Sequence, residues 1–188
     1  MSTLTVKQFE HWLLQIRRSD ERAFSELFRW TYNPMLRYAT RLVNSEAAAH
    51  DILQEVYIKL WHKRYELDEN KSLKAYMYRM VRNKCFNYLR DTAREEIGFD
   101  ENITPDDSES TTDSELSTEQ LALLNKKLDC WIEELPARQR EAFELSRFEG
   151  LDHHEIANIM ACSPRTVNNH IVNALNYLRN RHLQSLND

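Results

Sequence analysis

Apolar residues recur at three- and four-residue spacings along most of this 188-residue chain, which is the pattern of helices that bury one face. The first such segment, residues 5–18, predicts a short helix. Its inward-facing residues are Phe9, Leu13 and Ile16. Asp20 caps a longer segment, DERAFSELFRWTYNPMLRYATRLV, which ends at Asn44. Pro34 should kink or break this helix, because its ring removes a hydrogen bond and clashes with the preceding turn.

Two further helices complete the N-terminal half. Ser45 begins the segment SEAAAHDILQEVYIKLWHKR, residues 65–71 form a loop, and Ser72 caps SLKAYMYRMVRNKCFNYLRD. The apolar residues of this last segment lie at helical spacing and form its predicted core face: Leu73, Met77, Met80, Val81, Cys85, Tyr88 and Leu89.

The C-terminal third predicts a helix-turn-helix. A capping box at residues 117–120 opens a helix that runs to about Glu134, and LPARQREAFELSRFEG predicts the next helix, with Gly150 just past its end. Residues 152–155 form a second capping box and open a short helix. About two residues then separate it from a longer helix, which Ser163 caps. The stripe that the longer helix should bury contains Val167, Ile171, Ala174, Leu175 and Leu178.

Composition and charge indicate how these helices are organised. Two glycines, four prolines and many Ala, Leu, Glu, Arg and Lys residues favour an all-α protein. Residues 1–94 hold 17 basic and 11 acidic residues, residues 95–119 hold ten acidic residues and no basic one, and residues 120–188 are nearly neutral. The acidic segment is poor in apolar residues and cannot repay the entropy of ordering. The sequence therefore predicts two small helical domains, 1–94 and 120–188, joined by a flexible acidic linker at 95–119.

Several kinds of chemistry are excluded. No apolar run reaches the roughly 18 residues that span a bilayer, and the first 30 residues are polar, so we expect a cytoplasmic protein with no membrane insertion. Three well-separated cysteines indicate neither a disulfide framework nor a zinc site. His154 and Glu155 fail the metalloprotease pattern, because the second histidine position is Asn158. We expect no catalytic residue, no metal and no cofactor.

The long C-terminal helix carries a polar face away from its apolar stripe. Its residues are Arg165, Thr166, Asn168, Asn169 and Asn173. An ordinary solvated face more often carries Glu and Lys pairs, whereas amides and a guanidinium can pair bidentately with adenine and guanine in a major groove. The alternative interpretation is a plain polar helix surface.

The helix that Ser72 caps carries a second polar face. Its residues are Tyr76, Arg79, Asn83, Asn87 and Arg90, and Arg82 and Lys84 flank them. Aromatic, basic and amide groups on one face suit single-stranded nucleic acid, because bases stack on the ring, phosphates meet the cations and amides bind exposed base edges. The alternative is an ordinary exposed helix with partly buried tyrosines.

These two faces, in this order, resemble those of a known family. The chain is similar to bacterial extracytoplasmic-function (ECF) sigma factors, which are small members of the sigma-70 family. The resemblance covers nearly the full length and rests on DERAFSELFRWTYNPMLRYATRLV, AHDILQEVYIKLWHKR, LKAYMYRMVRNKCFNYLRD and LPARQREAFELSRFEGLDHHEIANIMACSPRTVNNHIVNALNYLR. It implies that residues 20–94 are sigma region 2, that residues 120–185 are region 4, and that the acidic segment replaces the region 3 domain of larger sigma factors.

The resemblance also implies roles for particular residues. Docking on the clamp helices of core RNA polymerase falls to Asp51, Gln54, Glu55 and Trp61, which alternate with the core residues Ile52, Val56 and Leu60. Melting of the −10 element and capture of one base fall to the loop Asp68–Lys74 and to Tyr76, Arg79, Arg82, Asn83, Lys84, Asn87 and Arg90. Reading of the −35 element falls to Ser163, Arg165, Thr166, Asn168, Asn169, His170 and Asn173.

The partners implied are core RNA polymerase, through its clamp helices and flap, promoter DNA, and an anti-sigma factor, which in relatives is often bound to a membrane. This chain departs from many relatives by carrying Asn168 and His170 in place of Lys or Arg. We therefore expect fewer phosphate contacts from this helix.

Two other classes of protein compete with this interpretation. The segment SPRTVNNHI also resembles the recognition helix of LuxR-like regulators, but such a regulator would carry a sensor or receiver domain over residues 20–94. A hydrolase with an appended binding module has no candidate nucleophile or metal set in this sequence. The sequence therefore favours a sigma factor, not itself an enzyme, that binds core polymerase, recognises both promoter elements and promotes DNA opening.

Overall fold

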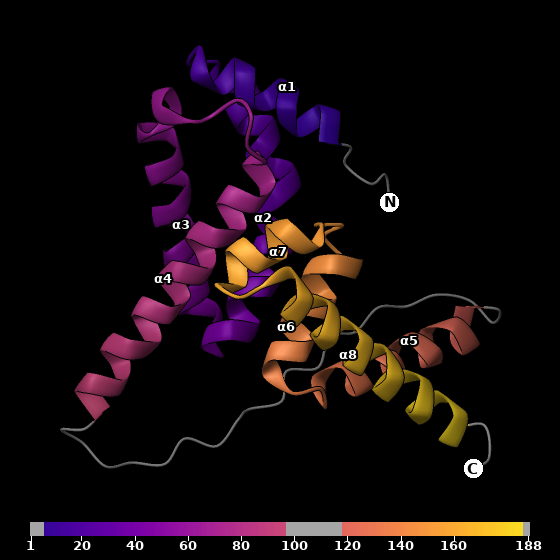
Figure 1. Cartoon of the computed structure of the whole chain (residues 1–188). Helices are drawn as coiled ribbons and strands as arrows, with labels where there is room; N and C mark the ends of the chain where they lie inside the picture. Colours follow the sequence, from indigo (N-terminus) through magenta and orange to yellow (C-terminus); the bar gives the residue numbers. More distant parts are fainter. Residues whose placement is uncertain (1–5, 97–117, 186–188) are drawn as a thin grey trace. The chain divides into compact units, whose positions relative to one another are not determined.

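The computed structural model describes residues 6–96 and 118–185, and every regular element within those ranges is a helix (Figure 1). The chain divides into two compact units between Asp100 and Glu101. The all-α prediction is therefore confirmed over the described residues. Most of the predicted linker lies outside them, and so does Ser117, the capping residue of the box predicted at residues 117–120.

The first unit contains α1 (Val6–Arg17), α2 (Glu21–Val43), α3 (Glu46–His62), the 3₁₀ helix η1 (Arg64–Glu66) and α4 (Leu73–Glu96). α2 packs against α3, α4 and α1, and α3 also packs against α4. η1 occupies the start of the predicted 65–71 loop, and α4 runs two residues past the predicted domain boundary at 94.

The predicted helix ends of this unit are set by side-chain caps. The Asp20 carboxylate accepts the backbone N–H groups of Arg22 and Ala23, at 2.8 and 3.1 Å. Asn44 ends α2 in the left-handed conformation, with φ of 53°. The hydroxyls of Ser45 and Ser72 accept backbone N–H groups at the starts of α3 and α4. These caps confirm the boundaries that the sequence predicts.

Pro34 does not break the helix, because α2 is continuous from Glu21 to Val43. Thr31 and Tyr38, about one turn either side of it, and the adjacent Met35 are buried in the bundle. The Thr31 hydroxyl donates to the Leu27 carbonyl at 2.6 Å. Packing on both sides of Pro34 therefore holds the helix together despite the missing backbone hydrogen bond.

A buried pair of hydroxyls joins α2 to α3. The Thr31 and Tyr57 oxygens lie 2.7 Å apart, and the single Thr31 proton is directed to the Leu27 carbonyl. Thr31 therefore accepts from Tyr57, so neither buried hydroxyl lacks a partner. Burial raises the pKa of Tyr57 far above its ordinary value, which keeps this hydroxyl protonated as a donor.

The core face predicted for α4 is correct only as far as Cys85. Leu73, Met77 and Val81 are buried, but Tyr88 and Leu89 are 38% and 36% exposed. Residues 86–91 are all exposed, and Figure 1 shows this part of α4 extending past α2 and α3. The apolar spacing continues beyond the point where a packing partner ends, so those two predictions are wrong.

The second unit contains α5 (Thr118–Glu133), α6 (Ala137–Arg147), α7 (His153–Met160) and α8 (Pro164–Gln184). The predicted capping box is present, because the Asp152 carboxylate accepts the N–H groups of His154 and Glu155 and the Glu155 carboxylate accepts that of Asp152. Ala161, with φ of 52°, ends α7, so the turn holds three residues rather than about two. Gly150, with φ of 64°, lies three residues past the end of α6.

The predicted helix-turn-helix is formed by α7 and α8, and α6 packs against both. Val167, Ile171, Ala174 and Leu178 are buried along α8 as predicted. Leu175 is 38% exposed, because it lies at the edge of that stripe rather than within it. α5 covers the far part of α8, where Trp131, Ile132 and Leu135 pack against Ala174 and Leu178.

A polar contact reinforces the packing of α5 on α8. The Glu134 carboxylate accepts a hydrogen bond from the Tyr177 hydroxyl at 2.5 Å and one from the Arg181 guanidinium at 2.7 Å. These two donors, with Tyr177 the stronger, hold the pKa of Glu134 below its ordinary value of 4.5. A carboxylate whose pKa folding lowers adds stability above that ordinary value, and the added stability is lost as the pH falls through the folded-state pKa.

We therefore predict that Glu134→Gln lowers the melting temperature of the full-length protein near neutral pH, and that this deficit shrinks below pH 4.5. Thermal unfolding followed by circular dichroism measures both values. Glu133→Gln makes the same change at the neighbouring exposed residue and should have no effect at either pH. A Glu134→Gln deficit of the same size in acid would show that the carboxylate charge is not its cause.

Candidate functional site

The exposed face of α8 contains most of the residues predicted to read a duplex. Arg165, Asn168, Asn169 and Asn173 are exposed, whereas Thr166 and His170 are half-buried. The Ser163 hydroxyl accepts the Thr166 N–H at 3.1 Å and contacts the Thr166 hydroxyl at 2.8 Å. Ser163 and Thr166 are therefore engaged in capping the helix.

One residue of the α8 face was missed by the sequence reasoning. Val172 is 44% exposed and lies two helical turns beyond Arg165, opposite the buried stripe. Its spacing from Arg165 and Asn169 was the available signal. Exposed methyl groups among amides and a guanidinium can contact a thymine methyl in a major groove, which gives this face apolar as well as polar means of selecting bases.

The exposed face of α4 holds five of the seven residues predicted to contact unpaired bases. Arg79, Asn83, Asn87 and Arg90 are exposed and Tyr76 is half-buried. The Arg79 guanidinium lies 5.8 Å from the centre of the Tyr76 ring. Phe86, which is 42% exposed, lies three residues after Asn83 and adds an aromatic side chain that the sequence reasoning missed.

The other two predicted residues lie elsewhere. Arg82 is only 7% exposed, and its guanidinium lies 4.4 Å from the centre of the Phe86 ring. Lys84 forms an ion pair with Glu55 of α3. Both lie at the edges of the buried face of α4, where the neighbouring helix or the next turn covers them. The structure therefore does not bring Arg82 and Lys84 onto the exposed face with the other five.

The loop before α4 is an ordered turn. The Asp68 carboxylate accepts the Asn70 N–H at 3.0 Å and pairs with the Lys71 ammonium at 3.1 Å. These contacts, with the backbone hydrogen bond the largest, hold the pKa of Asp68 below its ordinary value. Leu67 and Leu73 are buried at the two ends of the turn. The exposed residues 68–72 are thus held beside the start of α4.

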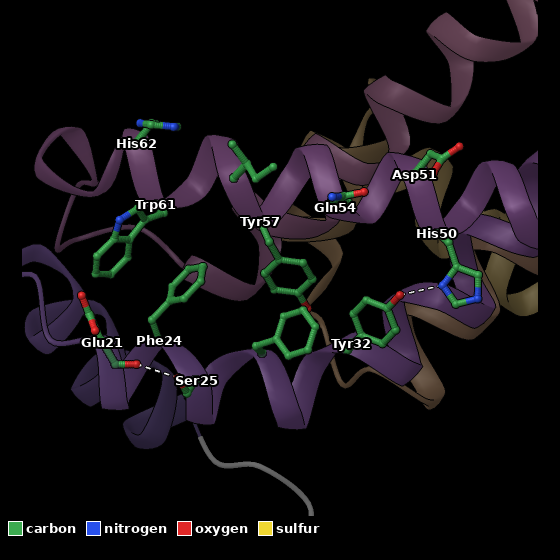
Figure 2. Close-up of a pocket in the computed structure, with 12 residues that line it drawn as sticks. Glu21, Phe24, Ser25, Tyr32, His50, Asp51, Gln54, Tyr57, Trp61 and His62 are labelled. Carbon is green, nitrogen blue, oxygen red and sulfur yellow. Dashed lines mark hydrogen bonds between the residues drawn. The ribbon is translucent and has the colours of Figure 1, made fainter.

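A groove of about 630 Å³ lies between α2 and α3 (Figure 2). Its lining residues are Glu21, Phe24, Ser25, Phe28, Tyr32, His50, Asp51, Gln54, Tyr57, Ile58, Trp61 and His62. Figure 2 shows the aromatic rings of Phe24, Tyr32 and Tyr57 between the two helices, with Asp51 and Gln54 along α3. Phe28 and Ile58 remain 41% and 51% exposed. The groove is therefore apolar inside and polar along α3.

Three of the four residues predicted to dock on polymerase line this groove: Asp51, Gln54 and Trp61. Glu55 does not, because it faces α4 and pairs with Lys84. The core positions predicted between them, Ile52, Val56 and Leu60, are buried as expected. The groove residues of α2 were missed, although Phe24, Phe28 and Tyr32 recur at four-residue spacing.

A hydrogen bond closes one end of the groove. The Tyr32 hydroxyl lies 2.6 Å from His50 Nδ1, and their rings are stacked (Figure 2). At the other end, the Phe24 and Trp61 ring centres lie 5.0 Å apart. These contacts fix aromatic side chains of α2 against α3, so the apolar lining is preformed.

Within the part of the chain that the structure describes, no three His, Cys, Asp or Glu side chains gather in a way that could hold a metal ion. Among the described helices, none is long and apolar enough to cross a membrane.

Comparison with known proteins places both units in one family. The family model for Sigma-70 region 2 matches residues 27–95, and that for Sigma-70 region 4 matches residues 125–178. The RNA polymerase sigma-H factor of Pseudomonas aeruginosa is 27% identical over 179 residues, which are 91% of this chain and 92% of that protein. The ECF RNA polymerase sigma-E factor of Haemophilus influenzae is 27% identical over 89% of this chain and 91% of its own length.

Two solved structures share the fold. The sigma factor RpoE of Bartonella quintana, in a complex with the anti-sigma factor NepR, gives a TM-score of 0.67 at 21% identity and covers 84% of this chain and 95% of that one. CnrH, in complex with the cytosolic domain of CnrY, gives a TM-score of 0.59 at 19% identity and covers 96% of this chain and 99% of that one. Sigma-70 family models match both units of this chain, and an ECF sigma factor is related to it over about nine tenths of its length. The chain therefore belongs to the sigma-70 family as an RNA polymerase sigma factor of the ECF type.

Proposed function

We propose that this sigma factor is a dissociable initiation subunit that binds core RNA polymerase, reads the −35 element as duplex and the −10 element as unpaired strand, and so promotes opening of promoter DNA. It performs no catalysis itself. The observation that carries this proposal is that one chain exposes two helix faces of different chemistry. The α8 face has the amides and guanidinium that suit duplex base edges, and the α4 face has the rings and cations that suit unpaired bases.

Base selection at −35 follows from the exposed groups of α8. Asn168 and Asn169 favour adenine through bidentate pairs, and Arg165 favours guanine. Val172 adds methyl groups that favour thymine. From Pro164 to Asn176, the cationic candidates are limited to Arg165 and the half-buried His170, so phosphate attraction from this helix is weak and base contacts carry most of its preference.

Capture of the −10 strand falls to α4 and the loop before it. Tyr76, Arg79, Asn83 and Asn87, with Phe86 at the edge of the face, offer stacking, phosphate contact and base-edge pairing along three turns of helix. Unstacking one base costs a few kcal/mol, which contacts with the ordered turn at residues 68–72 offset. Arg82 and Lys84 are left out of this proposal because other contacts engage them.

Docking on polymerase falls to the groove between α2 and α3. A helical partner such as the clamp helices would place apolar side chains on Phe28 and Ile58, and basic or amide groups would meet Asp51 and Gln54 along α3. Glu55 contributes through its ion pair with Lys84, which joins α3 to α4. Because relatives with this fold are held by an anti-sigma factor or a cytosolic domain, we extend the proposal to a protein inhibitor of this chain.

We predict that Asn83→Ala and Tyr76→Ala each reduce initiation on a duplex promoter by about tenfold, because one base-stacking or base-edge contact is worth about 1–3 kcal/mol. Abortive transcription by the reconstituted holoenzyme measures the initiation rate. A pull-down measures the affinity of each variant for core polymerase, which should equal that of the wild-type protein. Asn180→Ala, an exposed asparagine at the far end of α8, is the control. A template with a pre-melted −10 bubble should restore most of the activity, and equal inactivity on that template would exclude a role in opening.

We predict that Arg165→Ala and Asn169→Ala each lower initiation at the cognate promoter by about tenfold, because a bidentate base pair contact is worth about 1–3 kcal/mol. The measurement is a substitution scan of the −35 element with wild-type and variant holoenzymes. Changing the one base that a residue reads should abolish the difference between wild type and that variant. Equal weakening at every −35 position would instead assign these side chains to phosphate.

A further inference from the structure

The connection between α3 and α4 is held by α1, a helix that precedes the residues matched by the region 2 model. This connection comprises η1 and the loop Asp68–Lys74, to which we assign the capture of a base. Figure 1 shows α1 lying beside the connection at one end of the first unit. The contacts involve side chains from the end of α1 and from three successive parts of the connection.

The first contact is a triangle of hydrogen bonds around Ser19. Arg64 donates from Nε to the Ser19 hydroxyl at 2.9 Å and from Nη2 to the Tyr65 hydroxyl at 2.9 Å, and the two hydroxyls lie 2.7 Å apart. The guanidinium also lies over the rings of Trp61 and Tyr65, 4.4 and 4.3 Å from their centres. η1 is thus fixed to Ser19, two residues past the end of α1.

Ser19 adopts an uncommon backbone conformation at this point. Its φ is 64°, in the left-handed region that residues with a side chain rarely occupy. The conformation belongs to the helix end: the Ser19 N–H donates to the Ile16 carbonyl at 2.9 Å and the Asp20 N–H donates to the Gln15 carbonyl at 3.1 Å. This hydrogen-bonded end of α1 fixes where the Ser19 side chain begins.

The second and third contacts lie further along the connection. Arg17, the last residue of α1, forms an ion pair with Glu69 in the loop. The Lys74 ammonium, in the first turn of α4, lies 5.7 Å from the centre of the Phe9 ring of α1. The residues from Phe9 to Ser19 therefore contact η1, the loop and the first turn of α4 in succession.

These polar contacts are not needed to attach α1 to the bundle. Phe9, Trp12, Leu13 and Ile16 are all buried, and apolar burial of four such side chains is the larger attachment. An exposed ion pair such as that of Arg17 adds little to global stability. Its consequence is local, because it joins the exposed Glu69 of the loop to the end of α1.

We propose that α1 positions the base-capture loop, with Ser19 and Arg17 as positioning residues that hold η1 and Glu69 in the geometry that receives the unstacked base. This inference rests on the proposed function of the loop. These contacts already order residues 66–72, so binding of the base causes a smaller loss of conformational entropy in the loop.

Hydrogen exchange in the full-length protein tests the positioning directly. Ser19→Ala and Tyr65→Phe each remove one hydroxyl of the triangle and should speed exchange of residues 66–72 by about two- to tenfold. Arg17→Glu and Glu69→Arg should each speed it by about two- to fivefold, and the double variant, which restores an opposite-charge pair, should return it to the wild-type rate. Unchanged exchange in all four single variants would overturn the proposal.

Matched controls separate positioning from general loss of stability. Ser185→Ala removes a serine hydroxyl in the other unit, and Arg29→Glu disrupts the exposed pair with Glu26 in α2. Neither control should change exchange at residues 66–72. The melting temperatures of Ser19→Ala and Tyr65→Phe should match those of the controls, because the apolar attachment of α1 is intact.

Initiation by holoenzyme containing Ser19→Ala or Tyr65→Phe provides the functional readout, on a promoter identified by transcription of genomic fragments with core and wild-type protein. We expect a loss of about two- to tenfold on duplex template, with core affinity unchanged. Faster loop exchange with full initiation, while Asn83→Ala remains impaired, would overturn the positioning role and leave the proposed function intact. Failure of the wild-type holoenzyme to initiate at any fragment would overturn both.

Discussion

The burial of one face of α2 against α3 and α4 is the interaction on which the first unit depends. Leu27, Thr31, Met35 and Tyr38 form this face, and their packing keeps α2 continuous across Pro34. Because α3 and α4 each give one face to α2, their remaining surfaces are fixed in orientation. The groove between α2 and α3 and the exposed face of α4 are both consequences of that packing. The proposed recognition surfaces therefore lie on packed helices, except for the turn between α3 and α4, which α1 contacts.

The same division of faces governs the second unit. Burial of Val167, Ile171 and Ala174 leaves the opposite side of α8 exposed, and the serine cap fixes where that side begins. The charge of the chain then limits how strongly this side of α8 is expected to bind DNA by itself. With Arg165 and His170 the only cationic candidates from Pro164 to Asn176, and ten acidic residues between positions 95 and 119, we expect the chain to have little general attraction for DNA. Specific binding is accordingly expected to require both units to be held on polymerase, where two modest interactions act at high effective concentration.

The helices, their caps and the helix-turn-helix could be predicted from sequence, because capping side chains and apolar spacing are local properties. Errors arose where tertiary contacts decide whether a side chain is buried or exposed. Apolar spacing does not reveal where a packing partner ends, which is why Tyr88 and Leu89 were assigned to the core, nor does it locate the edge of a buried stripe, where Leu175 lies. It also does not reveal the burial of Arg82 or the pair between Lys84 and Glu55, and the binding roles of these three residues stay predictions. Of the residues that line the groove, only those of α3 were named from the sequence, although Phe24, Phe28 and Tyr32 recur at four-residue spacing along α2.

The most direct test of the account compares the free protein with its complex with core polymerase on the same promoter fragments. Binding is measured by fluorescence anisotropy across a range of salt concentrations, and initiation by transcript mapping. The account predicts weak binding by the free protein, because its reading helix offers few phosphate contacts, and initiation at a defined start site only when core and protein are both present. Tight, sequence-specific binding by the free protein, with no specific initiation on adding core, would contradict it and indicate a DNA-binding regulator instead.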